Sequence, residues 1–275
     1  MLKVHVIEYT NLILKKLNIK NPTIILTSII VLILLLISNT LKIVVILCRL
    51  KRKNKLYIME EPVANNKNVK RNFHFNNIEK KDKNFMYQNL ERSNCYNCNF
   101  SGSNFDYVNF RGAHFKSSSF LNCSFKWSEF IGTNFRKSNF KNANFENAIF
   151  DSVKLDDINF KDAKFKNTIF VSCDVSKAKN LDIDNPEIRI FNEMPEIEIS
   201  EDLRIATLNT FNNKYVKSSR ILDTKDGGIN NLSLMILLET FDEETLINGL
   251  NYITDNLDKD FYTISYLIKY IKNIE

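Results

Sequence analysis

Four cysteines are the side chains of this sequence whose chemistry is easiest to name. Cys95 and Cys98 form a Cys-x-x-Cys pair, and with Cys123 and Cys173 they would supply the four thiolates of a structural zinc site. The fifth, Cys48, makes the count odd, and the spacing shows no pattern of a secreted disulfide framework. The sequence therefore predicts a reducing compartment. Whether the thiols can meet depends on the elements that carry them.

Other catalytic chemistry is sparse. The chain has three histidines, His5, His74 and His114, and none has a Ser, Cys or carboxylate at an interpretable spacing. The sequence contains no phosphate-binding loop, dinucleotide-binding glycine motif, H-E-x-x-H or nucleophile elbow. We therefore predict a protein that is not an enzyme and that takes no cofactor and no small-molecule substrate.

Phenylalanine recurs with a period of five residues. Between residues 85 and 175, Phe occupies 15 of the 19 positions whose number is a multiple of five; the other four are Leu90, Cys95, Leu155 and Val175. The remaining six of the 21 Phe lie outside this interval. No helix or flat strand has a period of five. The pattern predicts a solenoid with each centre pointing inward.

The positions around each centre support this geometry. Two residues before it the side chain is usually small or aliphatic, and one residue before it Asn occurs in 10 of the 19 repeats. If four segments close a square coil, residues twenty apart stack at about 4.8 Å, the spacing of hydrogen-bonded strands. We expect a structural core ladder of Phe105, Phe125, Phe145 and Phe165.

Segments such as SGSNF, GTNFR, KSNFK, NANFE and KDAKF resemble the A(D/N)LXX repeats of the pentapeptide-repeat family. The resemblance covers residues 83–180, about a third of the chain, with Phe replacing Leu at most centres. It implies a right-handed quadrilateral β-helix of about five coils. It also implies a binding surface or a spacer without a catalytic site.

The coil register predicts whether the four cysteines can bind one metal ion. It places Cys95 at a centre, Cys98 at an inward position on the next face, and Cys123 and Cys173 on other faces of later coils. They cannot converge on one ion, so we predict buried small side chains and no metal site.

Two outward columns are candidates for function. The first alternates in charge along Asp106, Lys126, Glu146 and Lys166, which favours solubility and register. In the second, Tyr107 lies one coil from Trp127, the only Trp of the chain, and this pair is our candidate protein-binding site. The alternative is that residues 56–82, with Phe73 and Phe75, fold back and cover both rings.

An apolar stretch near the N-terminus predicts a membrane anchor. Residues 22–41 carry no charge, and twenty helical residues cover the roughly 30 Å of a bilayer core. We predict an N-terminal segment 1–22, a transmembrane helix 23–48 and a basic tether 49–82. Six basic residues follow the span within residues 42–55 and four precede it, so the positive-inside rule predicts a cytoplasmic repeat domain.

The repeat register ends after Val175. Residues 181–198 read as a capping or linker strand, and residues 199–275 as a small all-α domain of four helices, the first beginning at Ser200 and continuing through Tyr215. The predicted fold class is therefore mainly β: a β-solenoid with an N-terminal transmembrane helix and a helical C-terminal domain.

Charge separates the function hypotheses. Residues 83–180 carry 14 basic and 9 acidic side chains, a net +5, and residues 181–275 carry 9 and 18, a net −9. We expect a membrane-anchored scaffold or spacer with an unidentified protein partner. The alternative is a DNA-mimicking modulator of a topoisomerase such as gyrase, which would need an acidic rod. A basic rod that binds nucleic acid is also disfavoured, because acidic side chains interrupt every basic column.

Overall fold

The structure of the protein is a computed structural model that describes residues 73–274. The predicted N-terminal segment 1–22, the predicted span 23–48 and most of the predicted tether 49–82 lie outside the described residues. Within residues 73–274, no helix has both the length and the apolar character needed to cross a membrane.

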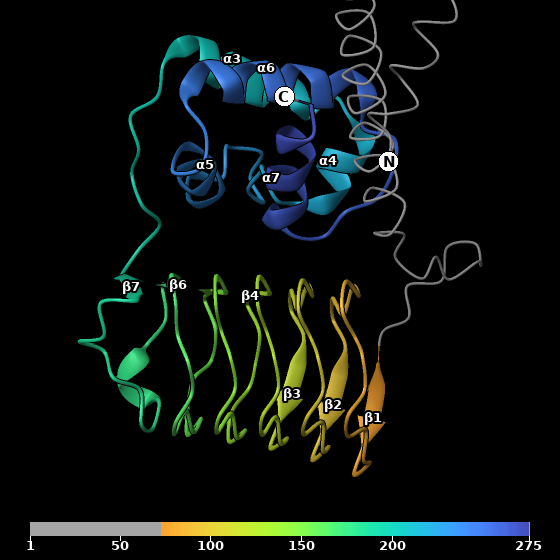
Figure 1. The fold of residues 1–275 in the computed structure, drawn as a ribbon, viewed down its shortest axis with the longest axis vertical. Helices are drawn as coiled ribbons and strands as arrows, with labels where there is room; N and C mark the ends of the chain where they lie inside the picture. Colours follow the sequence, from red (N-terminus) through yellow and green to blue (C-terminus); the bar gives the residue numbers. More distant parts are fainter. Residues whose placement is uncertain (1–72, 275) are drawn as a thin grey trace, which may run out of the picture. The chain divides into compact units, whose positions relative to one another are not determined.

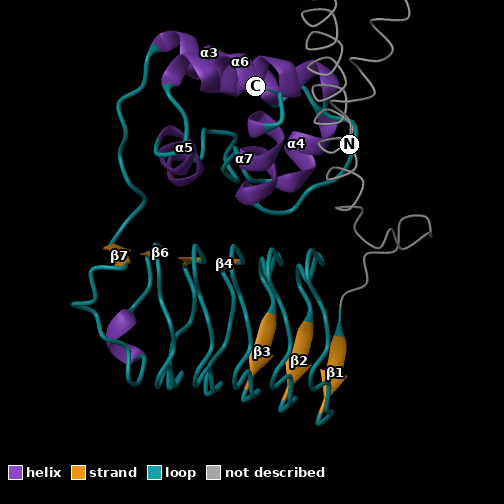
Figure 2. Cartoon of the chain, viewed as in Figure 1, coloured by secondary structure: helices purple, strands orange, loops and turns teal. Residues whose placement is uncertain are grey.

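Residues 73–191 form a right-handed β-solenoid with short strands on two of its faces (Figures 1 and 2). One parallel sheet joins β1 (His74–Asn76), β2 (Asn94–Tyr96) and β3 (His114–Lys116), and the other joins β4 (Glu129–Ile131), β5 (Ile149–Asp151), β6 (Thr168–Val171) and β7 (Ile188–Phe191). Partners are twenty residues apart, as in Phe75 with Cys95 and Cys95 with Phe115.

The solenoid has about six turns, whereas the sequence predicted about five. The additional turn comes from both ends of the Phe run. Phe75 lies in β1 and pairs with Cys95, and Ile190 lies in β7 and pairs with Phe170. These residues keep the five-residue register, so the coil extends beyond the segment in which Phe itself is regular.

Backbone hydrogen bonds between successive coils explain how faces of only a few residues each hold the solenoid together. The Phe105 amide donates to the Ser124 carbonyl at 2.7 Å, and the Phe125 amide donates to the Asn144 carbonyl at 2.8 Å. At the corners, the second residue after each centre takes a left-handed conformation, as in Asn122 (φ 56°) and Gly132 (φ 60°). Asn and Gly accept this conformation at the lowest cost, which accounts for their frequency in that position.

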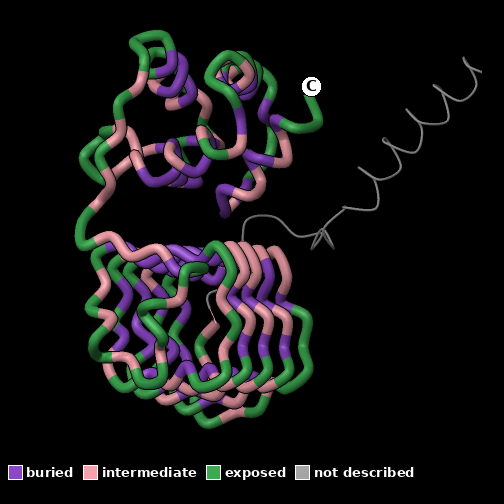
Figure 3. Tube along the Cα trace, turned by 60° about the vertical axis from the view of Figure 1, so that its left-hand side comes forward, coloured by how far each residue is buried: buried purple, intermediate pink, exposed green. Residues whose placement is uncertain are grey.

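Stacked phenylalanines fill the inside of the coil. Figure 3 marks the buried positions along the successive coils in purple. Phe105, Phe125 and Phe145 are fully buried, and their successive ring centroids are 5.2 and 5.3 Å apart with nearly parallel planes. Phe165 is half-buried, 5.5 Å from Phe145. Rings of adjacent faces meet edge to face, as Phe120 meets Phe125 at 5.6 Å. Both arrangements suit the aromatic quadrupole, so the rings contribute geometry as well as buried area.

The hydroxyl groups at the small inward position form hydrogen bonds inside the coil. The Ser128 hydroxyl donates to the Phe105 carbonyl, and the Ser138 hydroxyl donates to the Phe115 carbonyl, each at 2.6 Å. Each bond connects two coils through the interior. A small hydroxyl residue therefore fits this position without leaving a buried polar group unpaired.

Five α-helices follow the solenoid within the described residues: α3 (Glu201–Thr210), α4 (Lys214–Ser219), α5 (Asn231–Leu238), α6 (Glu243–Asn256) and α7 (Ile264–Lys272). Ser200 caps α3 by accepting from the Leu203 amide, as its pattern predicts. The predicted single helix from Ser200 through Tyr215 is two helices. Asn213 separates them because its side chain accepts from the Tyr215 amide and caps α4.

The helices cover the solenoid face formed by β4 to β7. Ile149, Ile169 and Val171 point outward from this face, yet they are buried in one cluster with the leucines and isoleucines of the helices. Arg189 of β7 also pairs with Glu239 at the end of α5. Removing this apolar area from water holds the helical domain against the coil.

Candidate protein-binding surface

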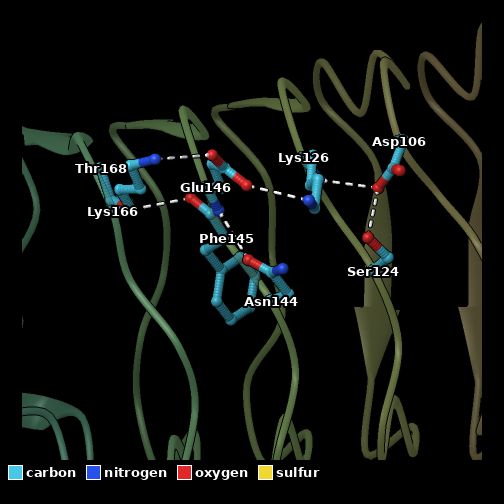
Figure 4. Close-up of polar contacts among 8 residues, drawn as sticks. All are labelled: Asp106, Ser124, Lys126, Asn144, Phe145, Glu146, Lys166 and Thr168. Atoms are coloured by element: carbon cyan, nitrogen blue, oxygen red, sulfur yellow. Dashed lines mark hydrogen bonds and ion pairs between the residues drawn. The ribbon is translucent and has the colours of Figure 1, made fainter.

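The predicted charge ladder forms on the face that follows Phe105, Phe125 and Phe145 (Figure 4). Glu146 lies between Lys126 and Lys166, at 2.9 and 3.2 Å from their ammonium nitrogens. The hydrogen bond from Lys126, and then that from Lys166, hold the pKa of Glu146 below its ordinary value. Asp106 instead accepts from the Lys126 backbone amide at 2.8 Å and from the Ser124 hydroxyl. The ladder pairs its own charges and leaves little net field for a partner.

An aromatic column runs beside the ladder. Tyr107 is half-buried and stacks on Tyr87, with ring centroids 4.8 Å apart and planes 16° from parallel. Trp127 is the next residue of the column, one coil further along, and it is also half-buried. Burial, followed by the charge of Asp106, raises the pKa of Tyr107. The aromatic column is hereafter Tyr87, Tyr107 and Trp127.

These aromatic residues occupy a costly position of the coil. Tyr87, Tyr107 and Trp127 have φ of 63°, 61° and 58°, the left-handed corner conformation that Asn or Gly takes in many other coils. For a bulky side chain this conformation costs on the order of 1–2 kcal/mol. Backbone preference therefore does not explain three aromatic residues in one column. The contacts that their rings make in the structure are the stack of Tyr87 on Tyr107 and the packing of Trp127 against a hydrophobic cluster.

The surroundings of Trp127 include a neighbour that neither sequence-based interpretation expects. The Trp127 side chain packs against the hydrophobic cluster that the helices share with Ile149, Ile169 and Val171 of the solenoid. Phe73 and Phe75 lie in the first coil, where Phe73 is 5.6 Å from Phe85. Residues 73–82 therefore do not reach the two rings, and residues 56–72 lie outside the described part. The aromatic column thus runs from the edge of the helical domain toward the first coil.

Sequence reasoning missed three features of this region. Tyr87 follows from the same twenty-residue spacing as Tyr107 and Trp127. The β4–β7 face, which the helices cover, could also have been recognised from the sequence. Ile149 and Ile169 occupy the position before a centre, where Asn is most frequent. Aliphatic residues in an outward slot indicate a covered face. The third feature, a buried Glu129 beneath the helices, has no such signal.

The four cysteines within residues 73–274 line the interior of the coil, and Cys173 is half-buried. Cys95, Cys98 and Cys123 are buried, and burial raises the pKa of Cys95 and of Cys123 to about 12. Cys98 and Cys123 donate weakly to the carbonyls of Phe75 and Phe100 in the preceding coil. Across residues 73–274, no three His, Cys, Asp or Glu side chains are grouped to hold a metal ion.

The geometry of the coil agrees with a family model. The model described as pentapeptide repeats matches residues 93–130, 118–157 and 128–167. The solenoid is a pentapeptide-repeat domain. None of the curated proteins compared with the chain matches it.

Several solved pentapeptide-repeat structures are similar to this chain. Rfr23 from the cyanobacterium Cyanothece 51142 is 17% identical over 34% of this chain and 82% of its own, with a TM-score of 0.29. HetL from Nostoc sp. strain PCC 7120, described as involved in heterocyst differentiation regulation, is 15% identical over 48% of this chain and 55% of its own (TM-score 0.26). QnrB1, a plasmid-mediated fluoroquinolone resistance protein, is 12% identical over 44% and 91% (TM-score 0.20). These likenesses concern the fold alone.

Proposed function

We propose that this pentapeptide-repeat protein is a non-catalytic interaction scaffold, tethered to a membrane by residues 23–48, whose aromatic column binds a partner protein. The observation that carries the proposal is the placing of three aromatic residues at strained corners of consecutive coils. Aromatic side chains of this kind dominate the energy of many protein interfaces. Bulky residues that keep a strained backbone conformation in successive coils are typical of a functional surface.

The docking of the helical domain supports a scaffold. Ile149, Ile169 and Val171 show that a face of this coil can bind a folded module through outward side chains. The remaining faces repeat at the same twenty-residue register with other side chains. A coil of this kind can hold several modules at fixed spacing, because each face displays its residues at the strand interval.

The scaffold is tested by capturing partners with the full-length protein, solubilised from membranes of its native host. Tyr107→Asn should abolish retention of the specific partner while leaving the melting temperature unchanged or slightly higher, since Asn suits the left-handed corner. Lys137→Asn is the matched control: it occupies the same kind of corner, with φ 62°, but in another column. Equal capture by wild type and both variants would count against the aromatic column as the binding surface.

A DNA-mimicking role is the competing function. It requires a negative surface that substitutes for phosphates, whereas residues 83–180 carry a net +5. We therefore expect no change in gyrase supercoiling when the full-length protein is added at micromolar concentration. Clear inhibition or protection in that assay would replace the scaffold with the DNA-mimic function.

A further inference from the structure

A buried carboxyl group lies between the solenoid and the helical domain. Glu129 belongs to β4 and faces outward, but the helical domain covers it and leaves it 4% exposed. Its Oε1 atom accepts a hydrogen bond from the amide of Ile264, the first residue of α7. In the preceding coil the same position is Asn109, a neutral residue that fits the coil equally well. The coil itself therefore does not require a carboxyl group here.

Charged groups of both domains face Glu129. On the solenoid these are Arg111 and Asp151. On the helical domain Arg220 lies near Arg111 and forms an ion pair with Asp223. One guanidinium nitrogen of Arg111 donates to the Arg220 carbonyl at 2.9 Å. Within the described residues, the Nε atom of Arg111 and the Oδ1 atom of Asp223 are buried without a hydrogen-bond partner. Opening the interface would expose these polar atoms to water.

We propose that the helical domain docks reversibly on the β4–β7 face and that loss of the Glu129 proton weakens the docking. Opening would also release the connection between the domains, because Met194, Ile197 and Ile199 pack against the same hydrophobic cluster as the helices. Residues 192–200, between β7 and α3, contain no helix or strand, and several of them, including Glu193, Glu196 and Glu198, are exposed. This inference concerns the covered face and does not depend on the aromatic column binding a partner.

The direction of the pH effect follows from the protonated form. Burial raises the pKa of Glu129 to about 7, although the Ile264 amide and Arg111 both favour the carboxylate. In the open state Glu129 is hydrated and should titrate near the ordinary value of about 4.3 for a glutamate. Between about pH 4.3 and pH 7, Glu129 is therefore protonated in the closed state and ionised in the open state. Docking is strongest below about pH 4.3, weakens as the pH rises to about 7, and is constant above that. The docking constant falls by up to roughly 500-fold across this interval, the factor that corresponds to a difference of about 2.7 pKa units.

The test uses Trp127 as the reporter, since it is the only Trp of the sequence and packs against the hydrophobic cluster that the helices share with the β4–β7 face. Acrylamide quenching of the detergent-solubilised full chain should increase between pH 5 and pH 8. Cleavage of residues 192–200 by a glutamate-specific protease, normalised to an unstructured peptide at each pH, should increase in parallel. Glu129→Gln retains an acceptor for Ile264 but cannot titrate, so both signals should stay low across this range.

Two further variants make the test decisive. Glu129→Asn is a second neutral variant, for use if Glu129→Gln fails to fold. It introduces the residue found at this position in the preceding coil, and it should also remove the pH dependence. Glu146→Gln changes an exposed carboxylate of the charge ladder and should keep the wild-type pH dependence. A wild-type protein with constant quenching and cleavage from pH 5 to pH 8, or neutral Glu129 variants that still respond to pH, would overturn the proposal.

Discussion

The stability of individual residues in the coil depends on whether they point inward. Phe125 is fully buried and stacks between Phe105 and Phe145, whereas Lys126, its neighbour in sequence, has an exposed side chain that pairs with Glu146. We expect Phe125→Ala to lower the free energy of unfolding by about 3–5 kcal/mol through lost burial and the remaining cavity. Lys126→Ala should lower it by less than about 1 kcal/mol. Thermal or urea unfolding monitored by circular dichroism compares them, and equal losses would contradict the inward assignment of the centres.

Thiol reactivity is a second property decided at single residues. Cys95 and Cys123 are buried, and their pKa is raised to about 12, so almost no thiolate forms at pH 8. We expect iodoacetamide at pH 8 to leave both unmodified in the folded protein and to modify both in guanidinium. Mass spectrometry of the digested protein reads each site. Rapid labelling of Cys123 in the native state would mean that the coil interior opens at that position.

At the scale of elements, helix preference and packing oppose each other at Gly249. This residue lies inside α6, where Ala would normally stabilise a helix by about 1 kcal/mol. A Cβ atom there would lie 2.8 and 2.9 Å from the Cγ2 and Cγ1 atoms of Ile271 in α7, too close for ordinary contact. Overpacking of this kind costs about 1–3 kcal/mol, so Gly249→Ala should destabilise the helical domain on balance.

The double variant Gly249→Ala/Ile271→Ala provides the control for this prediction. Removing the Ile271 side chain opens the space that the new methyl group needs, so the double variant should lose less stability than the sum of the single variants. Chemical unfolding of all four proteins completes the cycle. Additive effects would show that α6 and α7 do not meet at Gly249 as described.

At the scale of the whole molecule, the membrane anchor remains a prediction from the sequence. Residues 22–41 contain no charge, so we expect the full chain to stay in the membrane fraction through an alkaline carbonate wash. A chain beginning at Met59 should remain in solution. Immunoblotting of both fractions measures the distribution, and a full chain released by carbonate would contradict a spanning helix.

The orientation of that anchor is measured separately. The basic residues between Lys42 and Lys55 favour the cytoplasmic side for everything that follows them. Protease added to right-side-out vesicles should therefore leave the pentapeptide-repeat domain intact until detergent is added. Digestion before lysis would place the domain on the opposite side.

The five-residue period alone determined the solenoid, because each repeat contacts its neighbours at a constant spacing of twenty residues. Such short-range rules make centres, small inward residues and left-handed corners readable one by one, and they also show that Cys95, Cys98, Cys123 and Cys173 occupy different places in the coil. The same rules place Tyr87, Tyr107 and Trp127 in one column. These short-range rules do not show which other part of the chain covers an outward side chain.

That information came only from the tertiary structure. The break between α3 and α4 depends on Asn213, whose amide reaches the carbonyls of Ile253 and Leu257 at the end of α6, about forty residues away. Glu129 is buried because α7, which starts 135 residues later, supplies the Ile264 amide. Contacts at such separations follow no period in the chain, and they arise from the fit between two surfaces that fold from different parts of it.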